Sequence, residues 1–246
     1  TIQDVVVKVE SIGSATNPNN FNITNCGLIA AYNAGTIRRC SVMVNYTLYV
    51  AGEIGVIAYQ NSGIIENCLS AVGTGTGAPK FPGRIPDEAS AAGIAYENSG
   101  TIKNCLFGGT LRTDGGTGNS YTAKDYAIAS SGGTITNCYY YHSKPRVGDA
   151  IYEDELYKDG DKSTVISKTQ EEMGTGEVTW LLNQNGKNDI WRQRKIGSAD
   201  ISLDKSYGRV KKNNDGTYSI VTPHIHRLDN GTLTEFKEVN SLDEIT

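Results

Sequence analysis

Short segments in which apolar and polar residues alternate recur through the first part of the chain. In a typical segment, Ile-Ala-Tyr is followed by Asn-Ser-Gly and then by a second apolar stretch that ends in Asn-Cys. Alternation with a period of two residues predicts β-strands. Asn-Ser-Gly predicts a turn, because Asn and Gly tolerate the left-handed backbone conformation. The pattern therefore predicts pairs of short strands separated by tight turns.

Four full copies of this unit align with constant offsets. In each copy a glycine precedes the cysteine by five positions and an isoleucine precedes it by three. The copies span residues 29–40, 57–68, 94–105 and 128–138, and a partial copy, Ile23-Thr24-Asn25-Cys26, precedes them. Such regularity predicts an all-β fold in which each copy forms one coil of a parallel β-solenoid. Right-handed coils are expected, because crossovers between parallel strands prefer that hand.

Equivalent residues of stacked coils are expected to form ladders with a spacing of about 4.8 Å. The predicted isoleucine ladder comprises Ile37, Ile65, Ile102 and Ile135. The predicted thiol ladder comprises Cys40, Cys68, Cys105 and Cys138. The predicted asparagine ladder comprises Asn67, Asn104 and Asn137, and Arg39 interrupts it as expected for an end coil. Because Ile and Cys are three residues apart, a bend near each asparagine is needed to turn both side chains inward.

The composition changes after Tyr141 and predicts three domains. We expect a β-solenoid over residues 1–145 and an acidic loop with a helical cap over residues 146–200. Residues 201–246 are expected to form a β-hairpin tail or the start of a following module. The chain begins at Thr1 rather than Met, so we also expect a segment of a longer polypeptide with neighbouring domains.

Local signals place elements in the second and third domains. Thr169-Gln-Glu-Glu172 is a capping box, which predicts the start of a helix. The open end of a solenoid exposes core residues and strand edges, and we predict that an apolar helix plugs it. The predicted cap residues are Trp180, Leu181 and Leu182. Asn214-Asp215-Gly216 and Asn230-Gly231 predict two hairpins.

Composition and charge exclude several classes of partner. The net charge of -4 and the pI of about 5.5 argue against nucleic-acid binding. No apolar run approaches the roughly 18 residues of a membrane span, so no membrane insertion is expected for this segment. The five cysteines are odd in number and none lies in a C-x-x-C pair, which argues against a zinc site or a disulfide framework. No cofactor is expected.

A few residues remain as candidates for binding. Tyr32, Tyr59 and Tyr96 occupy similar positions in the repeat and are candidates for glycan contact, or alternatively for a packing ladder. His224 with His226 is a candidate half of a metal site, against exposed histidines on a strand. Asp159 and Asp161 could bind calcium, against a solvated acidic loop. Two long loops, 73–89 and 113–124, are further candidates for recognition. No residue is assigned to catalysis.

The repeat resembles the GLUG-motif repeats of bacterial surface and secreted proteins, which also occur outside the catalytic domain of some immunoglobulin A proteases. The resemblance rests on Gly-x-Ile-x-Asn-Cys and the preceding Ala-Tyr-x-Asn-Ser-Gly, and covers about residues 23–141. It departs from the family in the first strand, where Gly55-Val-Ile-Ala replaces the favoured Gly-Leu-Val-Gly. The resemblance implies an extracellular location, on a bacterial cell surface or secreted, and carries over no catalytic residue.

The leading hypothesis is a non-catalytic structural or adhesion module that displays loops or adjoining domains. Its partner would be a host or bacterial surface protein, or a glycan. One alternative is a carbohydrate-binding or carbohydrate-active β-helix with lyase-like or hydrolase-like activity. Another is an accessory region of a large secreted protease. A carboxylate pair beside a groove across the stacked coils would favour the carbohydrate-active alternative.

Overall fold

The computed structural model describes residues 1–9, 25–44, 53–72, 91–109, 126–141, 163–221, 225–229 and 232–237. These residues form mainly strands, the large sheets are parallel, and the two helices are short. The all-β prediction is therefore confirmed at the level of secondary structure and strand direction. The chain divides into two compact units, Thr1–Lys168 and Thr169–Thr246, each of which is described by itself.

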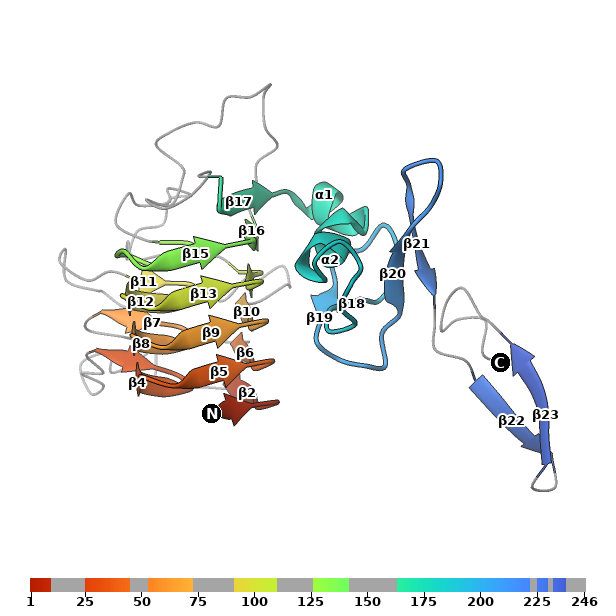
Figure 1. The fold of residues 1–246 in the computed structure, drawn as a ribbon, viewed down its shortest axis with the longest axis horizontal. Coiled ribbons are helices and arrows are strands. Elements are labelled where there is room, and N and C mark those ends of the chain that lie inside the picture. Colours follow the sequence, from red (N-terminus) through yellow and green to blue (C-terminus); the bar gives the residue numbers. More distant parts are fainter. Residues whose placement is uncertain are drawn as a thin grey trace, which may run out of the picture. The chain divides into compact units, whose positions relative to one another are not determined.

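The described residues of unit 1 form four parallel sheets, and successive repeats add strands to them in chain order (Figure 1). Sheet A comprises β1 (Ile2–Gln3), β5 (Thr36–Arg38), β9 (Ile64–Glu66), β13 (Thr101–Lys103) and β15 (Thr134–Thr136). Sheet B comprises β2 (Val6–Val9), β6 (Ser41–Val44), β10 (Leu69–Val72), β14 (Leu106–Phe107), β16 (Cys138–Tyr141) and β17 (Val165–Lys168). Sheet C comprises β3 (Cys26–Gly27), β7 (Ile54–Gly55) and β11 (Ala91–Ala92). Sheet D comprises β4 (Ala30–Asn33), β8 (Ala58–Asn61) and β12 (Ala95–Asn98).

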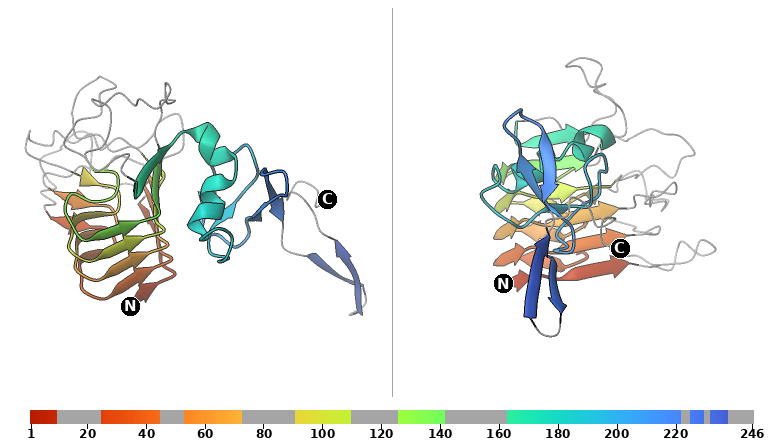
Figure 2. Two further views of the ribbon diagram at one scale, coloured as in Figure 1. Left: turned by 45° about the horizontal axis from the view of Figure 1, so that its top comes forward. Right: turned by 90° about the vertical axis from the view of Figure 1, so that its right-hand side faces the viewer.

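Each repeat follows the same path through the sheets. The chain passes from sheet C to sheet D, turns at Asn-x-Gly, enters sheet A, bends, and enters sheet B. Figure 2 shows the resulting stack of strands from two other sides. The fourth repeat joins sheets C and D through single parallel bridges, Tyr126 to Ala92 and Ala129 to Ala95. Among the described residues, no sheet closes on itself.

The bend between sheets A and B is a single residue in the left-handed conformation. Asn67, Asn104 and Asn137 have φ angles of 53°, 51° and 51°, and Arg39 has 51° at the same position. Asparagine adopts this region more readily than other residues with a Cβ. The bend breaks the strict alternation of the strand, so Ile65 and Cys68, three residues apart, are both fully buried.

The stack begins earlier than the repeat pattern indicates. Ile2 pairs in register with Ile37, and Asp4 has a φ of 58° at the position of the bend. The prediction that Arg39 belongs to the end coil is therefore wrong. Its guanidinium forms a two-point ion pair with Asp4, Nε to Oδ1 at 2.7 Å and Nη2 to Oδ2 at 2.6 Å. The motif was not recognised there because Asp4 and Val5 replace the usual Asn-Cys.

Two other assignments also need correction. Cys26 pairs with Ile54 in sheet C, so Ile23-Thr24-Asn25-Cys26 is not a partial copy of the Ile-x-Asn-Cys segment. The parallel stacking does not end at Tyr141 either, because β17 pairs in register with β16 and places Val165 opposite Cys138. Valine fills the buried thiol position equally well as a small apolar side chain.

The described residues of unit 2 form two short helices and three antiparallel strand pairs. Its helices are α1 (Gln170–Gly174) and α2 (Glu177–Leu182). Its strand pairs are β18 (Arg192–Gln193) with β19 (Ile201–Ser202), β20 (Arg209–Lys212) with β21 (Tyr218–Val221), and β22 (Ile225–Asp229) with β23 (Thr232–Lys237). Thr169 and Glu172 form the predicted capping box of α1. The Asn-Asp-Gly signal joins β20 to β21, and the Asn230-Gly231 signal lies between β22 and β23, outside the described residues.

The core of unit 2 surrounds Trp191, which is fully buried together with Val178 and Leu182. The buried amide of Gln193 connects the surrounding segments. Its Oε1 accepts from Thr179 Oγ1 at 2.8 Å, and its Nε2 donates to the carbonyl of Ser198 at 2.7 Å. Of the predicted cap residues, Leu182 is buried and Trp180 and Leu181 are half-buried, all on α2. That they plug the stack of unit 1 stays a prediction.

The bend at Asn67 can be tested with two substitutions. Asn67→Gly keeps the left-handed conformation available, and the Oδ1 atom that it removes accepts no hydrogen bond. Asn67→Val introduces a β-branched side chain, for which this conformation costs about 1–2 kcal/mol. We expect the free energy of unfolding in urea to be lower for Asn67→Val than for Asn67→Gly by at least about 1 kcal/mol. Equal stabilities would contradict the role assigned to the bend.

Candidate functional site

Isoleucines and cysteines of successive repeats lie in register in the interior of unit 1. Ile37, Ile65, Ile102 and Ile135 are paired neighbours in sheet A, and the first three are fully buried. Cys40, Cys68, Cys105 and Cys138 are fully buried beside them, and each thiol lies 3.3–3.4 Å from the carbonyl oxygen two residues earlier. Burial raises the pKa of the Cys105 thiol. At Cys105 the neutral, buried thiol is therefore a packing group rather than a nucleophile.

A continuous asparagine column runs at the turn between sheets D and A, at a position that the sequence indicated only as a turn. Asn33 Nδ2 donates to Asn61 Oδ1 at 2.7 Å, and Asn61 Nδ2 donates to Asn98 Oδ1 at 2.7 Å. In the shorter fourth repeat the carbonyl of Gly132 takes the place of the next amide, accepting from Asn98 Nδ2 at 2.9 Å. The constant Asn two residues before Gly in three repeats was the available signal.

The asparagines of the bend are connected less continuously than those of the turn. Asn137 Nδ2 donates to Asn104 Oδ1 at 2.8 Å, whereas the buried Asn67 Oδ1 has no hydrogen-bond partner. The backbone conformation therefore explains these asparagines better than hydrogen bonding between coils does. The two sets of asparagines therefore differ in role. Those at the bend adopt the left-handed backbone conformation, whereas those at the turn between sheets D and A connect neighbouring coils through buried amides.

The three candidate tyrosines lie in one aromatic column with Tyr126. Tyr59 and Tyr96 stack with ring centroids 5.8 Å apart and planes inclined by 5°. Tyr32 and Tyr126 approach them edge-on, at 6.3 Å and 6.4 Å. Tyr32 pairs with Gln60 rather than with Tyr59, so it lies one position later in its repeat. Its side chain is 69% exposed, whereas Tyr59 is 5% exposed.

Two carboxylates from different repeats converge on this column. Tyr59 Oη donates to Glu53 Oε2 at 3.1 Å and lies 3.4 Å from Glu97 Oε1. Tyr96 Oη donates to Glu53 Oε1 at 2.9 Å, and Gln60 Nε2 donates to Glu97 Oε2 at 2.6 Å. Both carboxylates thus accept hydrogen bonds from the tyrosines and the amide around them. The rings pack against one another and the carboxylates accept hydrogen bonds within the column, so the arrangement is explained by packing. Tyr32 is its exposed ring.

The side chains on the outer face of sheet A do not form a cluster of like charge. Its column reads Gln3, Arg38, Glu66, Lys103 and Thr136 in register. Arg38 Nε donates to Gln3 Oε1 at 2.8 Å, and Lys103 Nζ lies 2.9 Å from Glu66 Oε2. Alternating polar pairs of this kind are typical of a solvated surface.

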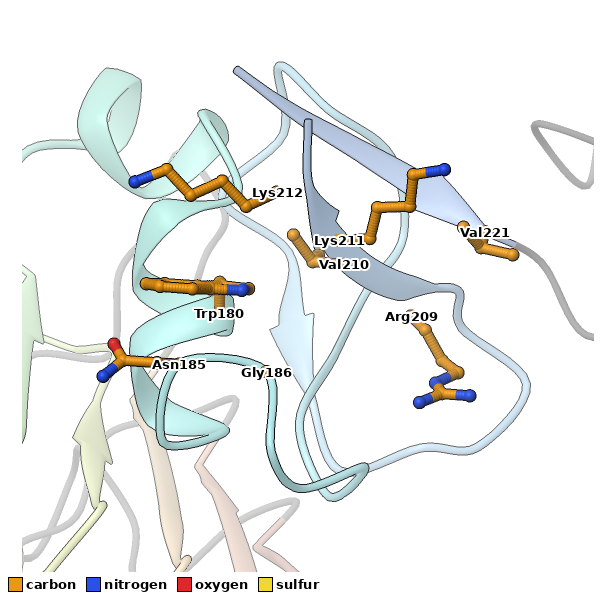
Figure 3. Close-up of a pocket in the computed structure, with 8 residues that line it drawn as sticks. All are labelled: Trp180, Asn185, Gly186, Arg209, Val210, Lys211, Lys212 and Val221. Atoms are coloured by element: carbon orange, nitrogen blue, oxygen red, sulfur yellow. The ribbon is translucent and has the colours of Figure 1, made fainter. Parts of the chain in front are cut away.

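Unit 2 carries a groove with a volume of about 460 Å³ between α2, the following loop and the β20–β21 hairpin. It is lined by Trp180, Asn185, Gly186, Arg209, Val210, Lys211, Lys212 and Val221 (Figure 3). Lys212 Nζ lies 5.1 Å from the centre of the Trp180 ring and 5.7 Å from that of Tyr218. Sequence reasoning missed this site because Trp180 and Lys212 are distant in the chain and share no motif.

The remaining candidates fall largely outside the described residues. His224, Asp159, Asp161 and the loops 73–89 and 113–124 are in that group, and the side chain of His226 is not described. Among the described residues, no three His, Cys, Asp or Glu side chains are arranged to hold a metal ion. The same part of the chain contains no helix with the length and apolar character needed to span a bilayer.

Comparison with protein-family models, with curated proteins and with solved structures finds no match to this chain. The arguments about function therefore depend on the geometry of its own residues.

The asparagine column predicts that two neighbouring residues of β8, Asn61 and Gln60, differ in how much stability is lost when each is replaced by alanine. Asn61→Ala leaves a buried donor on Asn33 and a buried acceptor on Asn98 unpaired, and each such group costs about 1–3 kcal/mol. We expect a loss of about 2–4 kcal/mol in the free energy of unfolding. Gln60→Ala, on the half-exposed side of the same strand, should cost less than about 1 kcal/mol. Urea unfolding of both variants measures the difference, and equal losses would remove the column from its proposed role.

Tyr59 predicts a pH dependence of stability in the alkaline range. Burial, and then the hydrogen bond with Glu53, raises the pKa of Tyr59 above its ordinary value of 10.0. As the pH rises the unfolded state therefore loses this proton first, so the associated stability is present below pH 10 and decreases above it. The wild-type protein should lose stability above pH 10 more steeply than Tyr59→Phe, by at most about 1.4 kcal/mol per pH unit.

Urea unfolding at pH 8, 10 and 11 measures this difference. Tyr32→Phe is the matched control, because the exposed ring of Tyr32 should leave the slope unchanged. The assignment fails if Tyr59→Phe follows the wild-type slope, or if Tyr32→Phe flattens it to the same extent.

Proposed function

We propose that unit 1 is a right-handed parallel β-solenoid that serves as a non-catalytic structural and adhesion module. The observation that carries this proposal is that the repeated residues lie in the core, at the bend or in the buried amide column. The repeated isoleucines and cysteines are in the interior, and the repeated asparagines form the bend and the buried amide column. Residues that recur for stacking are not available to a substrate, so the repeat supports a scaffold rather than an active site.

The lengths of the connections support a role in display. The turn from sheet D to sheet A and the bend from sheet A to sheet B keep nearly constant lengths in all repeats. The connection from sheet B to the next sheet C strand varies widely, from residues 45–53 to residues 73–90. Length variation confined to one connection is expected of a scaffold that tolerates insertions at one corner and uses them for recognition.

The proposed setting is a bacterial cell surface or a secreted protein, in line with the resemblance to GLUG-motif repeats. The partner would be a surface protein or a glycan that meets the inserted segments or adjoining domains. Carbohydrate binding by the repeat unit itself is the second candidate, favoured by the exposed ring of Tyr32 near Gln60 and Glu97. The mutual stacking of Tyr59 and Tyr96 makes it the weaker of the two.

Removal of one complete coil tests the solenoid. Equivalent residues Asn61 and Asn98 are 37 residues apart, so deletion of residues 64–100 joins Gly63 to Thr101 in register. A solenoid should lose one rung of each sheet and still unfold cooperatively, with a lower melting temperature, because each coil contacts only its neighbours. Circular dichroism spectra and thermal melts measure this outcome.

The control deletes residues 66–101, which joins Ile65 to Ile102 and so inserts one residue inside the sheet A strand rather than in the turn. In a stacked parallel sheet this slip turns the inward side chains outward, and we expect the control protein not to fold cooperatively. If both deletions unfold the protein, or if both leave it equally stable, the repeat is not an independent coil and the proposal fails.

A further inference from the structure

Sheet B has one edge strand whose side chains are exposed. Its six strands pair in the order β17-β16-β14-β10-β6-β2, so β17 and β2 are the two edges. Val165 and Ser167 of β17 are only 1% and 3% exposed, whereas Val6 of β2 is 58% exposed and Val5 before it is 37% exposed. The β2 edge is therefore the one at which another chain can pair.

Two residues of β2 direct their backbone N–H and C=O groups away from the sheet. β2 pairs with β6 in parallel, with Val6 opposite Ser41, and the Ser41 N–H donates to the Val5 carbonyl at 2.9 Å. The residues of a paired strand alternate between its two sides, so Val5 and Val7 bond towards β6. The backbone groups of Val6 and Lys8 face the opposite side, where no described strand pairs with them.

The sequence of β2 lacks the features that usually prevent an edge strand from pairing with another chain. Those features are prolines, bulges and several charged side chains. The segment Val5-Val6-Val7-Lys8-Val9 contains one charged residue and no proline, and it pairs with β6 without a shift in register. Valine also has a high strand propensity. The composition of this edge therefore favours the addition of a strand.

The strand is complementary to itself in one antiparallel register. When Val7 lies opposite Val7 of a second copy, Val6 lies opposite Lys8, and these two residues exchange both of their backbone hydrogen bonds. Val5 then lies opposite Val9 on the inward face, so every inward pair is valine against valine. On the outward face the aliphatic stem of Lys8 covers the exposed side chain of Val6. This register satisfies all the backbone groups of β2 that face the edge.

We propose that β2 pairs with β2 of a second copy of this chain, antiparallel and centred on Val7, which joins the two six-stranded B sheets into one. The pairing continues the hydrogen bonding that connects one coil to the next within each copy. A two-fold axis relates the copies, so both use the same surface and the assembly closes as a dimer. A head-to-tail arrangement would need the buried side chains of the β17 edge and would not close. The dimer depends only on sheet B and not on the role proposed for unit 1.

Sedimentation velocity of the whole chain over a range of concentrations measures its oligomeric state, and we expect an equilibrium between monomer and dimer. Val6→Lys places like charges at both Val6–Lys8 pairs of the dimer and should weaken it about tenfold. Adding Lys8→Glu to that variant places opposite charges at both pairs and should restore most of the affinity. Ile64→Lys is the matched control, because Ile64 is also an exposed β-branched residue but lies on the inner strand β9, and it should change the affinity less than about twofold.

Amide hydrogen exchange provides a second measurement at the edge itself. The N–H groups of Val6 and Lys8 should exchange more slowly as the concentration of the wild-type chain rises, because the second copy accepts from them. In Val6→Lys this dependence on concentration should decrease together with the dimer. Circular dichroism spectra check that each variant keeps its fold.

A chain that stays monomeric at every concentration would overturn the proposal, and so would polymers larger than a dimer, which would indicate head-to-tail addition. An equal loss of affinity in Ile64→Lys, or a double variant no tighter than Val6→Lys, would assign the association to a different surface or register. A dimer that Val6→Lys weakens and the double variant restores supports the proposed pairing.

Discussion

In-register stacking of one repeat on the next is the constraint on which the rest of unit 1 depends. Most backbone groups in sheets A to D find their partners one coil away, so register decides the hydrogen bonding of the whole unit. The column Asn33–Asn61–Asn98 makes that register specific, because a slip of one residue would leave buried amides unpaired. A slip of one residue would also turn the inward isoleucines outward. The amide column and the isoleucines therefore specify the same register.

The close approach of turns in neighbouring coils explains the glycines of the repeat. A Cβ on Gly63 would collide with the carbonyl oxygen of Gly35, and a Cβ on Gly100 with that of Gly63. The turn after each Asn is therefore limited to glycine by its neighbour in the stack and not by its own φ. This limit accounts for the constant spacing of Asn and Gly, and it places the amide column at the tightest part of each coil.

The sequence predicted the parts of the fold in which one residue type is needed for one physical reason. A bend near Asn67 and the in-register isoleucines followed from spacing alone, whereas the left-handed conformation of the bend is seen only in the structure. The rung at Ile2 and the strand β17 could not be recognised, because buried positions accept Val in place of Cys, and the bend accepts Asp4 when Arg39 is opposite to it. A motif describes the commonest solution, whereas packing accepts any side chain of suitable size and charge.

The candidate sites were less predictable for a related reason. Tyr32, Tyr59 and Tyr96 were correctly grouped by position, but a shift of one residue separates the exposed ring of Tyr32 from the two stacked rings, and no pattern in the sequence reveals exposure. The groove of unit 2 was invisible because its residues are brought together by antiparallel pairing and by the loop after α2.

The two units also differ in how their polar groups are used. In unit 1 the recurring Asn33, Asn61 and Asn98 bond to equivalent groups of the next coil, so their chemistry is directed inward and along the stack. In unit 2 the buried polar groups, such as Gln193, hold segments of the unit itself, while Lys211 and Lys212 remain without acidic partners among the described residues. Lys212 lies over the rings of Trp180 and Tyr218, so its charge is partly engaged within unit 2. Polar groups therefore connect one coil to the next in unit 1, whereas in unit 2 they connect segments of the same unit.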